Sequence, residues 1–124
     1  MTITRRSLLL SAAGLAMTAT GRAAGAPRQI LVLGGTGALG AAIVRRLVAA
    51  SDRVTVFTRP GSDRARLAGL AVAWAEGDLL NPADLATLFP GRRIDAVVSA
   101  VRVETVEATF YATWLPPAAR AMQA

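Results

Sequence analysis

The seven residues GGTGALG, from Gly34 to Gly40, constrain the fold of this chain more than any other segment. Three of the glycines recur at every third position, directly after the apolar run QILVL and directly before a segment with helical periodicity. Inside a regular element, glycine costs about 0.5–1 kcal/mol relative to alanine. A chain that gathers glycines at such a junction therefore needs a backbone conformation or a close approach that a Cβ atom would prevent.

Short apolar runs alternate with helical segments along the rest of the chain. Asn81 followed by Pro82 is typical of a helix start, whereas Pro116 and Pro117 should kink or restart the last helix. We expect strands at 29–33, 53–58, 71–76 and 96–100, a short helical turn ending near 67, and helices at 38–50, 82–88 and from 104 onward. This alternating order predicts an α/β fold, a Rossmann-like parallel sheet with flanking helices.

The setting of the glycines, between a strand and a helix in a β–α–β unit, is the one that a dinucleotide-binding loop requires. Gly34 would turn the chain off the strand, Gly37 would let the backbone approach a pyrophosphate, and Gly40 would let the helix pack closely. The backbone amides of residues 36–39 would then face the anion at a helix N-terminus, where the helix dipole favours negative charge. The alternative is a purely structural turn.

Three further positions stand at the carboxyl ends of expected strands. Arg59 occupies the place where proteins that prefer NAD usually carry an acid, and arginine there accommodates the 2′-phosphate of NADP. Asp78 follows the third strand near the expected adenine, and Ser99, Ala100 and Val101 end the fourth strand in small residues beside the crevice. NADP is therefore expected in preference to NAD. The alternatives are a solvated arginine at 59 and a strand-terminating role for Asp78.

Four segments, ILVLGGTGALG, VTVFTRP, EGDLLNPADL and IDAVVSAV, occur in that order between residues 28 and 124. In this they resemble the N-terminal half of an atypical short-chain dehydrogenase/reductase of the NmrA-like, NAD(P)H-binding kind. Arg64 is a less favoured candidate for binding the 2′-phosphate. The resemblance assigns to the pyrophosphate the residues Gly34, Gly35, Thr36, Gly37, Ala38, Leu39 and Gly40. It assigns Thr58 and Arg59 to the ribose phosphate. It assigns Asp78 and Leu79 to the adenine, and Ala100 and Val101 to the nicotinamide-side ribose.

No residue of this chain is predicted to be catalytic. Short-chain reductases often use Tyr-x-x-x-Lys, in which the ammonium lowers the pKa of the phenol, but Leu115 stands four positions after the single tyrosine, Tyr111. Lysine, cysteine and histidine are all absent, which excludes disulfides, thiolate and imidazole metal ligands and a histidine base. We expect the complete protein to be an NADP-dependent oxidoreductase or epimerase-like enzyme. The alternative is a non-catalytic NmrA-like redox sensor.

The net charge of +6 arises from 14 arginines against 8 acids. Arg5, Arg6 and Arg22 lie in the first 26 residues, which contain no acid. The other arginines are spread along the chain without the clustering on one face that nucleic-acid binding requires. Nucleic acid is therefore not an expected partner, and the expected ligands are a dinucleotide and a small-molecule substrate.

Residues 1–26 have the features of a Tat-type signal peptide. Arg5 and Arg6 precede an uncharged apolar stretch at 8–19, and the A-x-A sequence at 24–26 has the form of a cleavage site. The segment predicts export to the periplasm, with no stable membrane span after processing. Pro27 disfavours cleavage directly after Ala26, which leaves cleavage after Ala23 or an uncleaved membrane anchor as alternatives, with an ordinary amphipathic helix as a further one.

Residues 27–124 form the expected NAD(P)-binding domain. They contain four predicted strands, whereas a complete dinucleotide-binding fold has six in two halves. We therefore expect the N-terminal half of a Rossmann domain, ending after the fourth strand and its helix, from either a fragment or a truncated gene. The outer edge of the fourth strand should then expose unpaired backbone groups.

Overall fold

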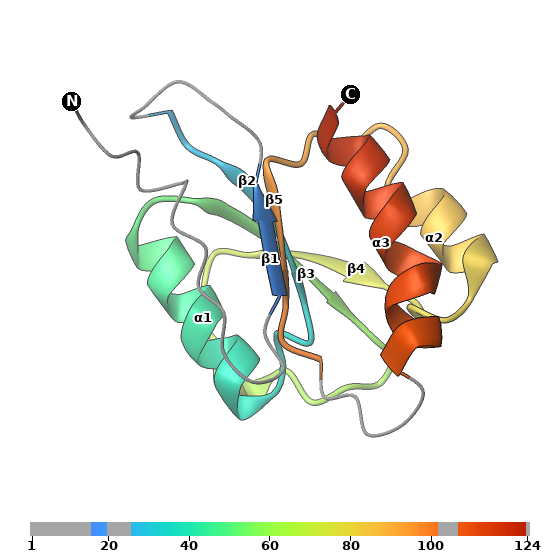
Figure 1. The fold of residues 1–124 in the computed structure, drawn as a ribbon. Helices are drawn as coiled ribbons and strands as arrows, with labels where there is room; N and C mark the ends of the chain where they lie inside the picture. Colours follow the sequence, from blue (N-terminus) through green and yellow to red (C-terminus); the bar gives the residue numbers. More distant parts are fainter. Residues whose placement is uncertain (1–15, 20–25, 102–106, 124) are drawn as a thin grey trace.

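The computed structural model describes residues 16–19, 26–101 and 107–123. A five-stranded sheet, in the order β1-β5-β2-β3-β4, lies between two layers of helices (Figure 1). Its parallel part consists of β2 (Gln29–Leu33), β3 (Arg53–Thr58), β4 (Ala73–Glu76) and β5 (Ala96–Ser99). The predicted α/β fold with a Rossmann-like parallel sheet is confirmed.

Each face of the sheet carries its own helices. The first face carries α1 (Ala38–Ala49) and the 3₁₀ helix η2 (Ala65–Leu67), and the second carries α2 (Pro82–Leu88) and α3 (Glu107–Gln123). The start of α2 is the one predicted, because Asn81 Oδ1 accepts a hydrogen bond from the Ala83 amide at 3.0 Å.

Strand β2 supplies side chains to two hydrophobic cores. Successive strand side chains point to opposite faces, so Ile30 and Val32 belong to the core under α1, whereas Leu31 and Leu33 belong to the core under α2 and α3. All four side chains are at most 2% exposed. Burial on both faces is the reason why this strand reads as a continuous apolar run rather than an alternating one.

The amino ends of the strands are joined by polar contacts. Arg28 donates to both carboxylate oxygens of Asp52, at 3.0 and 2.7 Å, and the hydrogen bond to Asp52 raises the pKa of Arg28. The Gln29 amide donates to the buried Asp95 carboxylate at 2.8 Å, and the Asp95 amide donates to the Gln29 carbonyl oxygen at 2.8 Å. These contacts fix the start of β2 relative to α1 and β5, at the end of the sheet opposite the glycines.

Helix α3 differs from the sequence-based expectation. It continues from residue 107 to residue 123 through Pro116 and Pro117, although each proline lacks the backbone donor of a helical residue. The neighbouring side chains of Trp114 and Ala118 are 1% and 0% exposed, and their burial against the sheet holds this part of the helix in place. The helix therefore does not restart at the prolines, and that part of the prediction is wrong. The expected start, at residue 104, lies outside the described residues.

The outer edge of β5 is not open. Residues Ala16–Ala19, which the sequence places in the signal segment, form β1 and pair antiparallel with β5, with Ala16 opposite Ser99 and Ala19 opposite Ala96. An unpaired strand edge presents a row of free amide and carbonyl groups. Here, β1 pairs with the amide and carbonyl groups at the outer edge of β5. The prediction of an exposed edge on the fourth parallel strand is therefore wrong. Within the described ranges, no helix combines the length and the hydropathy needed to cross a bilayer.

Candidate functional site

The turn that follows β2 lies directly against the residues that follow β5. Gly34 has φ +77°, and a Cβ atom on it would lie 2.9 Å from the Val101 nitrogen and 3.0 Å from the carbonyl carbon of Ala100. The Ala100 amide also donates to the Leu33 carbonyl oxygen at 2.9 Å. The structure thus brings together two predicted parts of the site, the glycine loop and residues 100–101.

The other glycines of the loop differ in what surrounds them. A Cβ atom on Gly40 would lie 2.0 Å from the Gly34 carbonyl oxygen, and one on Gly35 would lie 2.7 Å from Val56 Cγ1. Gly40 thus permits close packing of α1 against the turn at Gly34. A Cβ atom on Gly37 would meet nothing nearer than the Gly34 oxygen, at 3.8 Å. Gly37 therefore faces open space, with its backbone accessible to a ligand.

The N-terminus of α1 has the properties of an anion site. Gly37 is its N-cap residue, so no side chain of the N-cap accepts a hydrogen bond from the first amides of the helix. The first turn also contains no acidic residue. Gly37, Ala38 and Leu39 are exposed, and the Leu39 side chain is 49% exposed. Amides at such a terminus have no intrahelical acceptors, and the helix dipole adds positive potential there. A pyrophosphate fits this terminus.

Arg59 stands beside this loop at the carboxyl end of β3. Because Leu33 pairs with Phe57 in parallel register, β2 and β3 end next to each other. Arg59 is exposed, and none of the ion pairs found among the described residues involves it. Thr58 is only 6% exposed, and its carbonyl oxygen accepts the Gly77 amide at 3.0 Å. Of the two residues predicted to hold the ribose phosphate, Arg59 is the accessible one.

The loop after β4 is held by a carboxylate. The Asp78 amide donates to Asp84 Oδ2 at 2.7 Å, and Asp78 Oδ1 accepts the Leu80 amide at 2.9 Å. Asp78 is exposed, whereas the Leu79 side chain is 8% exposed and belongs to the core under α2 and α3. A contact between Leu79 and an adenine could therefore involve only its backbone.

Two contacts at this end of the sheet were not predicted from the sequence. Arg66 of η2 donates from Nη1 to the Thr36 carbonyl oxygen in the glycine loop at 3.3 Å, and Asp84 holds the Asp78 amide. The position of Asp84 in the first turn of α2 is a local signal that could have been used. Nothing local distinguishes Arg66, because arginine is the only basic residue type of this chain.

Tyr111 belongs to the core side of α3. Its ring packs against Trp114 with centroids 5.8 Å apart and an interplanar angle of 53°, and it is only partly buried. Leu115, four positions after Tyr111, is 37% exposed. In the described part of the chain, no group of three or more acidic side chains is arranged to hold a metal ion.

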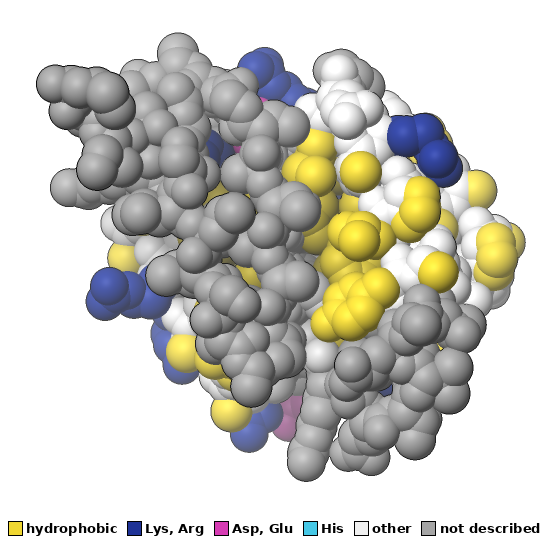
Figure 2. Space-filling model, viewed as in Figure 1, with side chains coloured by type: hydrophobic (Ala, Val, Ile, Leu, Met, Phe, Trp, Pro, Cys, Tyr) yellow, Lys and Arg dark blue, Asp and Glu magenta, His cyan; other side chains and the backbone are white. Residues whose placement is uncertain are grey.

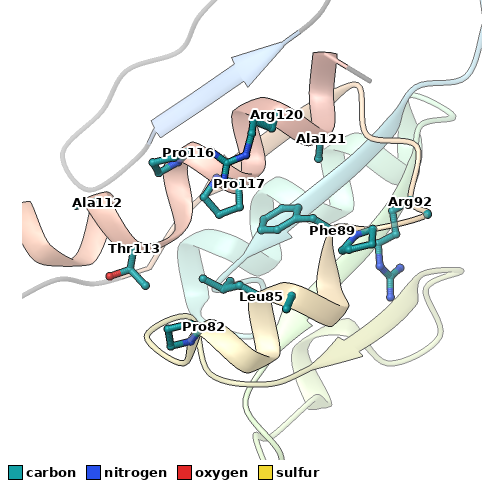
Figure 3. Close-up of a pocket in the computed structure, with 13 residues that line it drawn as sticks. Pro82, Leu85, Phe89, Arg92, Ala112, Thr113, Pro116, Pro117, Arg120 and Ala121 are labelled. Carbon is teal, nitrogen blue, oxygen red and sulfur yellow. The ribbon is translucent and has the colours of Figure 1, made fainter.

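A separate cavity of about 640 Å³ opens between α2 and α3. Leu85 of α2 and Phe89, the C-cap residue of α2, face Pro116 and Pro117 of α3 (Figure 3). Arg120 lies at the rim of the cavity. Figure 2 shows hydrophobic side chains gathered over this side of the molecule. No residue of the glycine loop lines the cavity, so it is distinct from the candidate cofactor site.

The topology places the candidate site where dinucleotides bind in this class of fold. From β2 the chain proceeds to β3 and β4 on one side, and β5 then lies on the other side of β2. Ligands of open α/β sheets bind outside the carboxyl ends of the strands at such a switch point. Here, the switch point is the junction of Gly34 with residues 100–101. Fold and loop define a Rossmann domain of the nicotinamide-dinucleotide-binding class.

Residues 30–114 match the model of the NAD dependent epimerase/dehydratase family, and the chain belongs to this family. A 49-residue stretch is 55% identical to "Sterol demethylase protein B" of Methylococcus capsulatus (strain ATCC 33009 / NCIMB 11132 / Bath), covering 40% of this chain and 15% of that protein. The crystal structure of gox2253 superposes with a TM-score of 0.63 at 29% identity, over 77% of this chain and 32% of that one.

WbmG of Bordetella bronchiseptica, solved in complex with NAD, shares the fold, with a TM-score of 0.57 at 21% identity over 79% of this chain and 34% of that one. The chain thus spans about a third or less of the length of these proteins.

Proposed function

We propose that this chain is the cofactor-binding part of an NADP-dependent oxidoreductase or epimerase-like protein of the NmrA-like kind. The observation that carries the NADP preference is Arg59, an exposed guanidinium at the end of β3, beside the glycine loop and outside the observed ion pairs. Proteins that prefer NAD usually place an acid there to bind the ribose 2′-hydroxyl, which would repel a 2′-phosphate.

The residues present fit a dinucleotide. The open space at Gly37 and the uncapped start of α1 suit the pyrophosphate, and the exposed Asp78 suits the adenine end. Ala100 and Val101, next to Gly34, lie where the nicotinamide-side ribose is expected. When bound, the cofactor supplies hydride transfer. This chain contributes binding and orientation, and no proton-transfer residue is assigned to it.

Titration with NADPH and NADH tests the proposal. Arg59→Glu should weaken NADPH binding by about tenfold or more, because it places a carboxylate against the 2′-phosphate and removes a charged hydrogen bond. NADH binding should change by less than about threefold.

Arg53→Glu is the matched control, since Arg53 is exposed at the amino end of the same strand and carries the same change of charge. Equal weak binding of both nucleotides by the unsubstituted chain, or binding of neither, contradicts the proposal.

A second candidate is a non-catalytic, dinucleotide-binding redox sensor. It is favoured by the packing of Tyr111 against Trp114 and by the absence of lysine from the chain. Following NADPH oxidation by the complete protein with a panel of aldehydes and ketones separates the two functions. Turnover supports the enzyme, whereas tight NADPH binding without turnover supports the sensor.

We also propose that residues 1–26 direct export by the Tat route. The proposal is supported by Arg5 and Arg6 and the uncharged stretch that follows them. A reporter that is active only in the periplasm, fused after residue 124, should lose its signal when both arginines are replaced by lysine. An unchanged signal with Arg5→Lys and Arg6→Lys together contradicts a twin-arginine signal.

A further inference from the structure

The 3₁₀ helix η2 brings a second arginine to the glycine loop. Arg66 Nη1 donates to the Thr36 carbonyl oxygen at 3.3 Å, across 30 positions of the sequence. The backbone of η2 is itself fixed, because Leu67 is 2% exposed and Arg45 of α1 donates to the Arg66 carbonyl oxygen at 2.9 Å. The Arg66 side chain nevertheless remains exposed to solvent.

Arg64, two positions earlier, points to a different partner. Its guanidinium carbon lies 4.2 Å from the centroid of the Trp74 ring, and its Nη2 atom lies 2.5 Å from Glu76 Oε2. Both partners belong to β4. The stacking and the ion pair hold Arg64 on the surface of that strand and neutralise its charge.

The pairing of Arg64 with Glu76 leaves two exposed arginines near the end of β3. Glu76 is the acid at the end of β4, and Asp63, which precedes η2, accepts the Ala65 amide at 2.9 Å. The ion pairs found in the described part of the chain include neither Arg59 nor Arg66. Two uncompensated guanidinium groups therefore flank the border between the glycine loop and the end of β3.

We infer that Arg66, and not Arg64, is the second cation that binds the 2′-phosphate of NADP, opposite Arg59. This inference rests on the proposed function. Arg66 stands at the glycine loop, on the side of the ribose expected at Arg59, and its guanidinium carries five N–H donors. Its contact with the neutral Thr36 carbonyl oxygen uses only one of these donors. The remaining donors are free to bind a phosphate oxygen, which is a stronger acceptor because it is charged.

The measurement is a set of dissociation constants for NADPH, NADH, adenosine 2′,5′-bisphosphate and AMP, with the full chain. Arg66→Gln should raise the NADPH and bisphosphate constants by about 10- to 100-fold, the range expected for a charged hydrogen bond. The NADH and AMP constants should change by less than about twofold. Glutamine retains a side-chain N–H that can still donate to the Thr36 carbonyl oxygen.

Arg64→Gln is the matched control, because it removes the same charge two positions away. It should leave all four constants within about twofold, and Arg66→Lys should restore part of the NADPH affinity through its charge. The unfolding temperature without nucleotide should be the same for Arg66→Gln and the unsubstituted chain, which separates a loss of charge from a loss of structure.

Four outcomes overturn the inference. Arg66→Gln could weaken NADPH and NADH equally, which indicates support of the loop only, or Arg64→Gln could produce the selective loss instead. An NADPH preference that survives Arg66→Gln also overturns the assignment of Arg66 while leaving the proposed function intact. If the unsubstituted chain shows no preference for NADPH, the proposed function and the inference both fail.

Discussion

At the scale of single residues, Gly37 and Gly40 separate two reasons for placing glycine in the same loop. Gly37 has φ −75°, which any residue adopts, so its value lies in the open space outside the backbone. Gly40 lies in a helix, and its missing Cβ atom leaves room for the carbonyl oxygen of Gly34. We therefore expect cofactor binding to depend on Gly37 and folding of the loop to depend on Gly40.

Substitution by alanine should therefore have opposite consequences at the two positions. Gly40→Ala should destabilise the chain by about 1–3 kcal/mol, because the added methyl group overpacks the turn. Gly37→Ala should change stability by less than about 1 kcal/mol but weaken NADPH binding, because the methyl group occupies the space next to the pyrophosphate. Urea unfolding and nucleotide titration of both variants measure the two effects. An equal loss of stability in both contradicts this separation.

At the scale of elements, the start of β2 depends on the ion pair between Arg28 and Asp52. The Asp52 side chain is 6% exposed and the Arg28 side chain 24% exposed. The hydrogen bonds from Arg28 therefore replace the contacts with water that the buried carboxylate has lost. The pKa of Arg28 is raised by its hydrogen bond with Asp52, against the opposing effect of burial. A raised pKa means that the contribution of the pair is complete below the ordinary arginine pKa and is lost only above the folded-state value.

Arg28→Met should lower the free energy of unfolding by about 2–4 kcal/mol, because it leaves the Asp52 carboxylate buried without a partner. Urea unfolding of the variant and the unsubstituted chain measures the difference. With arginine charged throughout, the contribution of Arg28 itself should not vary between about pH 6 and pH 10. As a control, Arg93→Met removes an exposed arginine from the loop before β5 and should cost less than about 0.5 kcal/mol. Equal costs for the two variants would show that the pair is unimportant.

At the scale of the whole molecule, the pairing of β1 with β5 relates the proposed signal segment to the solubility of the domain. Residues 16–19 cover the outer edge of β5, and all four residues of β5, 96–99, are buried. Removing residues 1–26 therefore leaves the outer edge of this strand unpaired. Exposed strand edges of this kind pair with other chains.

The shortened chain, residues 27–124, should consequently form larger and concentration-dependent species, as measured by light scattering. The full chain at the same concentration should scatter less. Replacing Thr18 by proline in the full chain should reproduce part of the effect, because proline cannot donate to a strand partner. Identical behaviour of the full and shortened chains would mean that β1 does not protect the edge.

Much of the parallel core could be predicted from the sequence because its signals are local. The bounds of β2 and β3 and the start of α2 agree with the prediction. Apolar runs, β-branched residues and an Asn-Pro helix start act within a few positions of the element that they specify. The glycine loop could be predicted for the same reason, since the order of strand, glycines and helix is contained in one short segment.

Tertiary structure alone decided the features that depend on partners far apart in the sequence. The antiparallel pairing of residues 16–19 with 96–99 spans some 80 positions, and the continuation of α3 through Pro116 and Pro117 depends on the burial of Trp114 and Ala118. Arg64 and Arg66 look alike in the sequence, but one stacks on Trp74 of β4 and the other reaches Thr36 in the glycine loop. Local propensity determined where the parallel strands and the start of α2 form, whereas packing determined the pairing of β1, the course of α3 and which side chains reach the candidate site.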